Sequence, residues 1–588
     1  MDLLAITVGS GLVLLAAYWT YGRWLANKLE LRRETPTPAW EFNDGQDFVP
    51  TPAPYLFSQH FSAIAAAGPI VGPIVAGLWF GWLPALIWIV VGSILVGGVH
   101  DITSLVASVR HRARSIAEIV REHMSRRAYL LFLSFVWIAL VYIVVAFTDI
   151  TASTFAPTPR ASDSPRQAAE AVRTGAAVAS SSMMYLLLAV AMGLALRYTR
   201  LSLKWATAIF MPLVLVSIWA GQHLPLAIPE WLWFNGSATK TWDILLLAYC
   251  GVASVVPVWA LLQPRGFLGG YFLSATVLLA FLGMVATALA GDSLAVTYPA
   301  FNGWRVEDAG KVYLLFPVLF ITIACGACSG FHAMISSGTS SKQLRHETDA
   351  RSIGYGSMLL EAFVAVISLS CVMVMARGAV GSPDRIFAEG ISRFIALLAQ
   401  GFAIDYATAK LYLYQFALLA FATFIYDTLD VCTRLGRYVL QEFTGWHDRT
   451  GRYVCTVMTL APPLYLVLQT ITSPTGEAVP AWKLFWTLFG TANQLLAALT
   501  LTGVTVWLLR TGKTWWYTAL PALLMMGITF TSLGLILWDW YRALGTTETF
   551  DINGPITSVL LVLAVMLVVE AFAVMYRTLR ARAVVGAA

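Results

Sequence analysis

The feature that most limits how this chain can fold is a long series of apolar runs, each about 18 residues or more with few or no charges. Hydrophobic residues make up 58% of the 588 residues, and charged residues make up only 12%. A helix of about 20 residues crosses the hydrocarbon core of a bilayer, where every backbone N–H and C=O must find a partner within the protein. The sequence therefore predicts an all-α polytopic membrane protein with about 15 transmembrane helices.

The basic residues indicate how these helices are oriented. The net charge is +6, and most of the 38 Lys and Arg residues fall in connections that share one side of the membrane, above all residues 110–127. Basic residues of membrane proteins gather in cytoplasmic connections. We therefore expect the N-terminus outside and the C-terminus in the cytoplasm, and we interpret the basic loop as a topology signal rather than a nucleic-acid-binding patch.

Two of the apolar segments are interrupted halfway across the membrane. In the first, Gly68-Pro69 and Gly72-Pro73 remove backbone donors and disfavour helical geometry before each proline. In the second, residues 320–338, small residues occupy the middle of the segment. Paired discontinuous helices in two halves of a membrane protein are typical of secondary transporters, which bind substrate where the helices separate.

The two interrupted segments share a pattern of small residues and are expected to cross the membrane in opposite directions, as an inverted repeat of five plus five helices requires. The alternative is that small residues only allow close helix packing. The repeat divides the chain into a peripheral first helix with a cytoplasmic loop (1–57), a first repeat (58–222), two inserted spans with an external loop (223–312), a second repeat (313–510) and two peripheral C-terminal spans (511–588).

Residues at the two breaks are the candidates for substrate binding. Free amides at the start of a half-helix, together with the helix dipole, favour an anion such as a small carboxylate. A later span adds an uncharged polar side chain that lines the pathway or bridges helices. The candidates are Gly68, Pro69, Gly72, Pro73, Cys325, Gly326, Gly330, His332 and Asn493.

Ionisable residues inside predicted spans are candidates for ion coupling. Glu361 lies near the middle of its span, where a charged carboxylate is costly and a protonated one is not. His60 and His332 lie beside the two breaks, and a histidine can change charge near neutral pH. The alternatives are a carboxylate paired for packing and neutral, hydrogen-bonded core histidines.

Two clusters of ionisable residues near the cytoplasmic ends of spans are predicted to form gate salt bridges. They are His100-Asp101 and the pair Asp427 and Asp430. The partners expected from the sequence are Arg110, Arg434 and Arg437.

Other function classes fit the sequence less well. A membrane-embedded enzyme would need a metal around His60, His100, His332 and Glu361, but these residues lack a local ligand spacing. The Cys325–Cys328 pair has no second pair to complete a zinc site. A nutrient sensor would need a signalling module, and no loop is long enough to form one. We predict no cofactor, no metal and no ATP-binding loop.

Motifs along residues 30–510 resemble the carbon starvation protein A (CstA) family. These motifs are Phe61–Pro73, Val99–Asp101, Arg114–Glu118, Leu262–Arg265, Ala324–Ala327 with His332, Ile353–Glu361, Asp430–Glu442 and Phe489–Leu495. The chain departs from the family pattern at Cys328 and at Gly266-Phe267.

The resemblance implies a bacterial inner-membrane importer with a leucine-transporter-like fold. It also implies proton-coupled uptake of pyruvate, or uptake of peptides under carbon starvation. Pyruvate or peptide as substrate, and proton or sodium as coupling ion, both fit the residues, and no oligomeric state is indicated. The expected partners are a small-molecule substrate, protons and the lipid bilayer.

Overall fold

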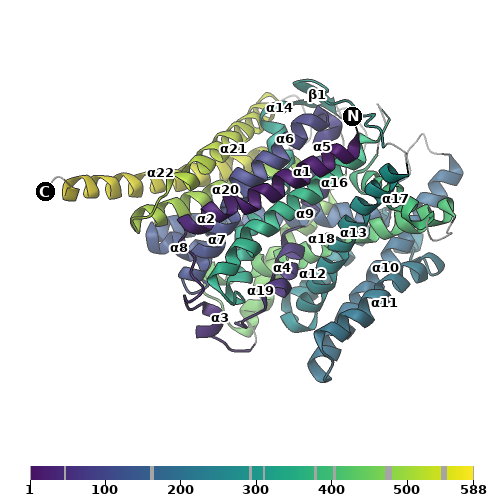
Figure 1. Ribbon diagram of the computed structural model, residues 1–588, viewed down its shortest axis with the longest axis horizontal. Coiled ribbons are helices and arrows are strands. Elements are labelled where there is room, and N and C mark those ends of the chain that lie inside the picture. The colour runs from purple at the N-terminus through teal and green to yellow at the C-terminus, as the bar shows by residue number, and fades with distance from the viewer. Residues whose placement is uncertain are drawn as a thin grey trace.

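Long helices lying alongside one another make up most of the computed structural model, and the last helix extends beyond the others toward the C-terminus (Figure 1). The structure describes residues 2–586 apart from 46–47, 66, 159–163, 291–293, 309–310, 377–380, 401–404, 470–479 and 544–552. Within these residues a predominantly helical, multi-pass membrane protein is confirmed.

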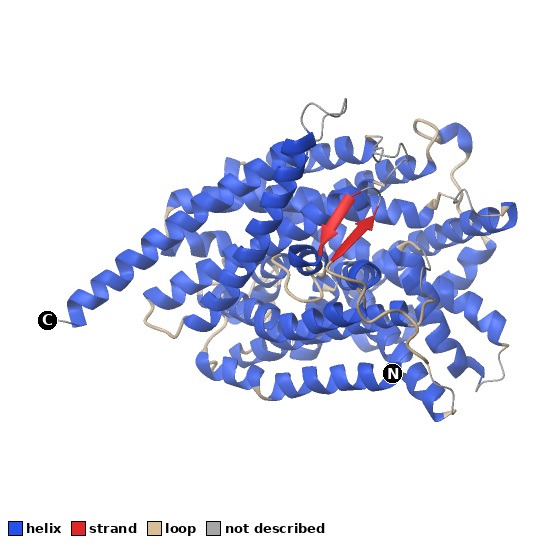
Figure 2. Ribbon diagram, turned by 90° about the horizontal axis from the view of Figure 1, so that it is seen from above, coloured by secondary structure: helices blue, strands red, loops and turns tan. Residues whose placement is uncertain are grey.

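The α-helices follow one another along the whole chain. Their bounds are α1 (Leu3–Trp19), α2 (Tyr21–Lys28), α3 (Pro38–Glu41), α4 (Ala53–Ile64), α5 (Gly68–Phe80), α6 (Trp82–Gly92), α7 (Gly98–Arg110), α8 (Ile116–His123), α9 (Arg126–Phe155), α10 (Pro165–Tyr198), α11 (Leu203–His223), α12 (Ala238–Val255), α13 (Leu262–Leu289), α14 (Leu315–Thr322), α15 (Phe331–Gly338), α16 (Ser357–Met373), α17 (Pro383–Gln400), α18 (Tyr406–Thr444), α19 (Arg449–Leu468), α20 (Ala481–Arg510), α21 (Trp516–Ala543) and α22 (Asn553–Gly586). Two strands, β1 (Arg305–Asp308) and β2 (Lys311–Leu314), form an antiparallel hairpin before α14 (Figure 2).

Twelve helices in the described part of the chain are long and apolar enough to cross a membrane, or thirteen if the bent pair α4 and α5 counts as one span. The remaining two expected spans, which start near residues 243 and 313, correspond to α12 and to the α14 and α15 pair. These elements are not among the twelve. The expected count of 15 therefore stays a prediction.

Each of the two expected segments is broken, but the first is broken only before Gly68. The sequence predicts an interruption at Gly72-Pro73 as well, and this prediction is wrong because Pro73 lies inside the continuous helix α5, where one missing backbone hydrogen bond is tolerated in packed surroundings. Helix α4 ends at Ile64, α5 begins at Gly68, and the two helices are bent by 46° relative to each other. Helix α14 ends at Thr322 and α15 begins at Phe331. Proline and small residues favour this geometry because they remove helical hydrogen bonds and allow non-helical backbone. Non-helical backbone at membrane depth must be packed within protein.

Two spans contain a short π-helical segment instead of an unbroken α-helix. Residues Ser93–Gly97 join α6 to α7, and residues Arg351–Gly356 lead into α16. The two spans pack closely: a side chain on Gly354 would meet the Cα atom of Ile102 at 2.8 Å. Because π-helical turns shift the register of the residues that follow, they often lie at functional sites.

Candidate functional site

The two helix breaks lie against each other in the middle of the fold. A Cβ atom on Gly68 would collide with the side chain of Cys325, and one on Gly72 would lie 2.5 Å from the backbone oxygen of Thr322. All four of these residues are buried. Segments that are 250 residues apart in sequence therefore meet at positions where only glycine allows the two backbones to approach. In this conformation no space for a ligand separates these particular atoms.

The second break is held by one side chain from α20. The Asn493 side-chain oxygen accepts a hydrogen bond from the Phe331 backbone N–H at 3.0 Å, and its amide group donates to the Ser329 hydroxyl at 3.0 Å. The Asn493 backbone oxygen accepts from the Gly330 N–H at 3.1 Å. Asn493 therefore satisfies amides at the start of α15, whereas the free amides expected from the sequence are those of the half-helix after Pro69.

A buried chain of ionisable side chains links the two halves beside the breaks. The Nδ1 atom of His332 lies 2.8 Å from an oxygen of Asp101, and its Nε2 atom lies 3.2 Å from an oxygen of Glu361. The other oxygen of Asp101 lies 2.7 Å from Nδ1 of His100. All four side chains have no exposed surface. We call Asp101, His332 and Glu361 the carboxylate–histidine triad.

This arrangement corrects one expectation from the sequence. His100 and Asp101 were expected to form a gate salt bridge with Arg110, but Arg110 pairs with Glu347 at 2.7 Å. Asp101 instead contacts His332, a residue on α15. The structure thus joins a predicted gate residue to two predicted coupling residues.

His60, the third predicted coupling residue, contacts a serine rather than a member of the triad. Its Nδ1 atom is 2.7 Å from the hydroxyl of Ser340, which follows α15. His60 is buried on α4, so this contact joins the inner half-helix of the first break to the segment after the second.

The acidic pair on α18 has a partner that the sequence analysis missed. Arg265 on α13 has no exposed surface, and its Nε atom lies 2.9 Å from an oxygen of Asp427. Its Nη1 atom also contacts Asp430. The prediction that Arg434 and Arg437 are the partners of this acidic pair is therefore wrong. Arg434 instead donates to the backbone oxygens of Ala253 on α12 and of Val256, which follows α12. An arginine four residues inside an apolar span was the available signal, because such a residue needs a buried partner.

We call Arg265, Asp427 and Asp430 the Arg265 cluster. One residue connects this cluster to the first broken helix. The Ser62 hydroxyl on α4 donates to Asp427 at 2.9 Å, and Tyr249 on α12 donates to Asp430 at 2.8 Å. One guanidinium thus faces two buried carboxylates of α18, and the helices α4, α12, α13 and α18 meet around it. Removing one partner of such a buried pair costs about 3–5 kcal/mol, so the cluster fixes the position of α4 while it persists.

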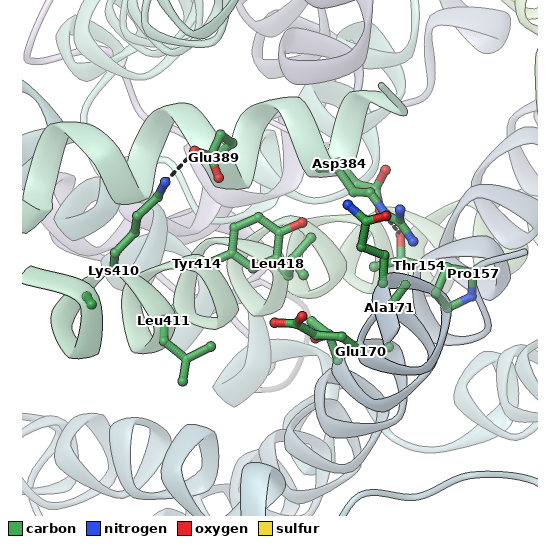
Figure 3. A pocket seen from close by; sticks show the side chains of 15 residues that line it. Thr154, Pro157, Glu170, Ala171, Asp384, Glu389, Lys410, Leu411, Tyr414 and Leu418 are labelled. Carbon is green, nitrogen blue, oxygen red and sulfur yellow. Dashed lines mark hydrogen bonds and ion pairs between the residues drawn. The ribbon is translucent and has the colours of Figure 1, made fainter. Parts of the chain in front are cut away.

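A polar cavity of about 650 Å³ lies between the end of α9, the start of α10, α17 and the start of α18 (Figure 3). Buried Asp384 accepts a hydrogen bond from Thr154 at its wall, and Lys410 pairs with Glu389 at 2.6 Å. Glu170 also lines the cavity. The sequence alone indicates no site in this region.

The intramembrane histidines do not support the alternative of a metal-dependent enzyme. Within the part of the chain that the structure describes, ligand atoms of His60, His100, His332 and Glu361 do not gather around one point as a three-ligand group.

Comparison with known proteins agrees with the resemblance seen in the motifs. The profile of the family described as carbon starvation protein CstA matches residues 3–384 and 379–532. A Campylobacter jejuni protein named peptide transporter CstA is 32% identical, over 89% of this chain and 79% of that protein. The Escherichia coli protein named pyruvate/proton symporter BtsT is 30% identical, over 91% of this chain and 81% of that protein.

Similar solved structures are more distant. A manganese transporter from Eremococcus coleocola superposes with a TM-score of 0.45 at 14% identity, over 91% of this chain and 98% of that one. MhsT in complex with L-phenylalanine superposes with a TM-score of 0.30 at 14% identity, over 86% of this chain and 98% of that one.

Proposed function

Because this chain belongs to the carbon starvation protein CstA family, we propose that it is a secondary active transporter of the bacterial inner membrane that imports small carboxylates such as pyruvate, or short peptides, by proton symport. Relatives carry names for both substrates, peptide transporter and pyruvate/proton symporter. The observation that supports a proton as the coupling ion is the carboxylate–histidine triad, which can hold a proton inside the membrane.

The triad couples proton binding to helix position because its members come from different helices. Asp101 lies on α7, His332 on α15 and Glu361 on α16, and every one of them is buried. A proton added to Glu361 removes its attraction to a charged His332 and so weakens the link between α15 and α16. Loss of that proton strengthens the link, which gives proton binding a differential effect on two conformations.

Substrate binding requires the two breaks to separate. Gly68, Pro69, Gly72 and Pro73 at the first break and Cys325, Gly326 and Gly330 at the second are the proposed contacts. Gly68 packs against Cys325 and Gly72 against Thr322, which supports a conformation in which the substrate site is closed. In alternating access, separation of the two breaks would open a carboxylate site to one side of the membrane. The proposed anion-binding group is the backbone N–H of Gly68 at the start of α5, since Asn493 covers the amides of α15. Pro69 has no N–H, and the N–H groups of Ile70 and Val71 donate to the backbone oxygen of Ala67.

The Arg265 cluster is the proposed gate that controls the movement of α4. Ser62 reaches Asp427 from the inner half of the first broken helix, so movement of α4 must break or carry along this hydrogen bond. His100 and Asp101 are proposed to act on the same movement through the triad rather than as a separate salt bridge.

The proposed architecture has 15 crossings with a five-plus-five inverted repeat, spans 2–6 and 9–13. The two helices that follow the breaks, α7 and α16, each adjoin a π-helical segment and each carry one carboxylate of the triad, Asp101 and Glu361. In both halves a π-helical segment thus comes shortly before the carboxylate of the triad, which supports a repeat better than small-residue packing does.

Contacts between loops support the span count behind the proposed orientation, in which the N-terminus lies outside. Glu30 pairs with Lys513 at 3.2 Å and Arg110 with Glu347 at 2.7 Å, and 15 crossings place all four residues in cytoplasmic connections. On the external side, Asp308 pairs with Lys483 at 2.9 Å. Each ion pair joins connections that this topology assigns to the same side.

Cysteine labelling tests this topology. Five expected spans lie between Asn43 and Glu230, and both residues are exposed. In a background without the six native cysteines, Glu230→Cys should react with a membrane-impermeant maleimide in intact cells, whereas Asn43→Cys should react only after permeabilisation. Labelling of both from one side would refute the span count, and the reverse pattern would invert the orientation.

Uptake in sealed proteoliposomes tests the function. With an inside-alkaline pH gradient, labelled pyruvate should accumulate, and a proton ionophore should stop accumulation. Adding di- and tripeptides as competitors distinguishes the two substrate classes, and a sodium gradient in place of the pH gradient distinguishes the two ions. A vesicle that accumulates neither pyruvate nor peptide under either gradient would rule out the proposal.

A further inference from the structure

Two histidines at the end of α7 and the end of α8 point their rings at each other. The Nε2 atom of His111 lies 2.8 Å from the Nε2 atom of His123. The carboxylate of Glu122 lies beside them, and one ligand atom from each of the three residues falls within 4.8 Å of the others. Both histidines are half-buried, and Glu122 is exposed. None of these residues contributes to the transport site described above.

From this geometry we propose that His111, His123 and Glu122 form a binding site for a divalent transition metal ion of the zinc type. Two imidazoles and one carboxylate are a donor set that zinc commonly uses, with water completing the tetrahedron. Borderline metals of this kind prefer imidazole nitrogen, whereas magnesium and calcium prefer sites made of oxygen alone.

The hydrogen bond of His111 selects the neutral tautomer that binds metal. Its Nδ1 atom lies 2.6 Å from the backbone oxygen of Ala107, and a carbonyl oxygen only accepts, so Nδ1 carries the hydrogen and donates it. The neutral ring therefore presents a lone pair at Nε2. A metal-bound histidine usually donates its other ring N–H to a carboxylate or a backbone oxygen, as His111 does here. The ring of Trp507 also orients the His111 ring by an edge-on contact, with 5.4 Å between the ring centroids.

Metal binding requires only a small rearrangement at His123. Without metal, the Nε2–H of His123 donates to His111. With metal, the hydrogen moves to Nδ1 of His123 through solvent, so that no proton is gained or lost and both Nε2 lone pairs face the ion. Zinc–nitrogen bonds of about 2.0–2.1 Å in a tetrahedron place the two nitrogens about 3.3 Å apart, slightly more than the present distance.

The two neighbouring arginines, Arg114 and Arg510, leave the three ligand side chains free to bind a metal ion. Arg114 contacts Glu122 at 3.3 Å, but this arginine is half-exposed and also reaches Glu118 at 3.6 Å, so Glu122 can turn toward the histidines. Arg510 donates to the backbone oxygen of His123 and not to its ring.

Zinc binding to the purified full-length protein, carrying no polyhistidine tag, tests the site. Equilibrium dialysis against Zn²⁺ followed by metal analysis should show one high-affinity ion per chain. The double variant His111→Ala/His123→Ala should bind at least about 10-fold more weakly, and Glu122→Gln should show a smaller loss. His447→Ala removes an exposed histidine outside the site and should bind like the unaltered protein.

A second measurement separates lost binding from lost folding. Zn²⁺ should raise the Tm of the unaltered protein and of His447→Ala, but not that of the double variant, which should still elute as a single species. Equal zinc affinity in the unaltered protein and the double variant would overturn the proposal and leave a hydrogen-bonded histidine pair. Because the readout is binding and stability, it is independent of whether the chain transports pyruvate, peptides or neither.

Discussion

Replacing Glu361 with glutamine is expected to abolish uphill accumulation of substrate while exchange of labelled for unlabelled substrate persists. Glutamine keeps the size and the hydrogen-bonding capacity of the side chain, but it cannot take up or release a proton. Since an oxygen of Glu361 lies 3.2 Å from His332, the substitution also leaves the imidazole facing a side chain that cannot become charged. Under an inside-alkaline gradient, the ratio of internal to external substrate should fall to about one in proteoliposomes, as expected when the coupling site no longer titrates.

The exposed residue Glu34 provides a matched control for this experiment. Glu34→Gln makes the same chemical change outside the membrane and should accumulate substrate normally. If Glu361→Gln still concentrates substrate, the proton is carried elsewhere, and His332 becomes the next candidate to replace. If exchange is lost together with accumulation, Glu361 acts in folding or substrate binding, and the coupling role assigned to the triad is wrong.

Replacing Gly72 with alanine is expected to abolish transport almost completely, although the change adds a single methyl group. The new Cβ atom would lie 2.5 Å from the backbone oxygen of Thr322, and a backbone oxygen at a helix end cannot rotate away as a side chain can. Overpacking of this kind costs about 1–3 kcal/mol, or more where the backbone must shift. Substrate exchange and the Tm of the purified variant measure the two consequences, and both should fall.

The neighbouring glycine provides an internal comparison, because its obstacle is a side chain. A methyl group on Gly68 would meet Cys325, so Gly68→Ala should also impair exchange. Adding Cys325→Gly removes the obstructing sulfur and should restore the Tm lost in Gly68→Ala, whereas the same second change should not restore the Tm of Gly72→Ala. Absence of any rescue would mean that the loss of stability at Gly68 does not arise from its contact with Cys325.

These contacts change the reason for expecting damage at the first break. The sequence indicates a space where substrate meets exposed backbone, so a large residue at Gly68 or Gly72 would block a ligand. The structure instead places the second break in that space. Substitution therefore acts first on the packing of two protein segments, and even alanine is large enough to have an effect.

The sequence by itself determined the membrane location and the positions of the breaks, because both depend on local chemistry. The length of an apolar run decides whether a helix can span the hydrocarbon core. A proline removes its own N–H and restricts the residue before it, so a break near the two Gly-Pro pairs could be expected without knowing their surroundings. The tertiary structure decided that the break precedes Gly68 and that Pro73 stays inside α5. The sequence also identified Glu361 and His332 as rare ionisable residues within spans.

Only the tertiary structure decided which of these groups act on one another. His332 contacts Asp101 across 231 positions of sequence, and Arg265 contacts Asp430 across 165. No local periodicity encodes such pairs, because each depends on how helices from distant parts of the chain pack and rotate. For the same reason Asn493, a polar residue with several possible roles in an isolated helix, is committed to one role by its distance from the start of α15.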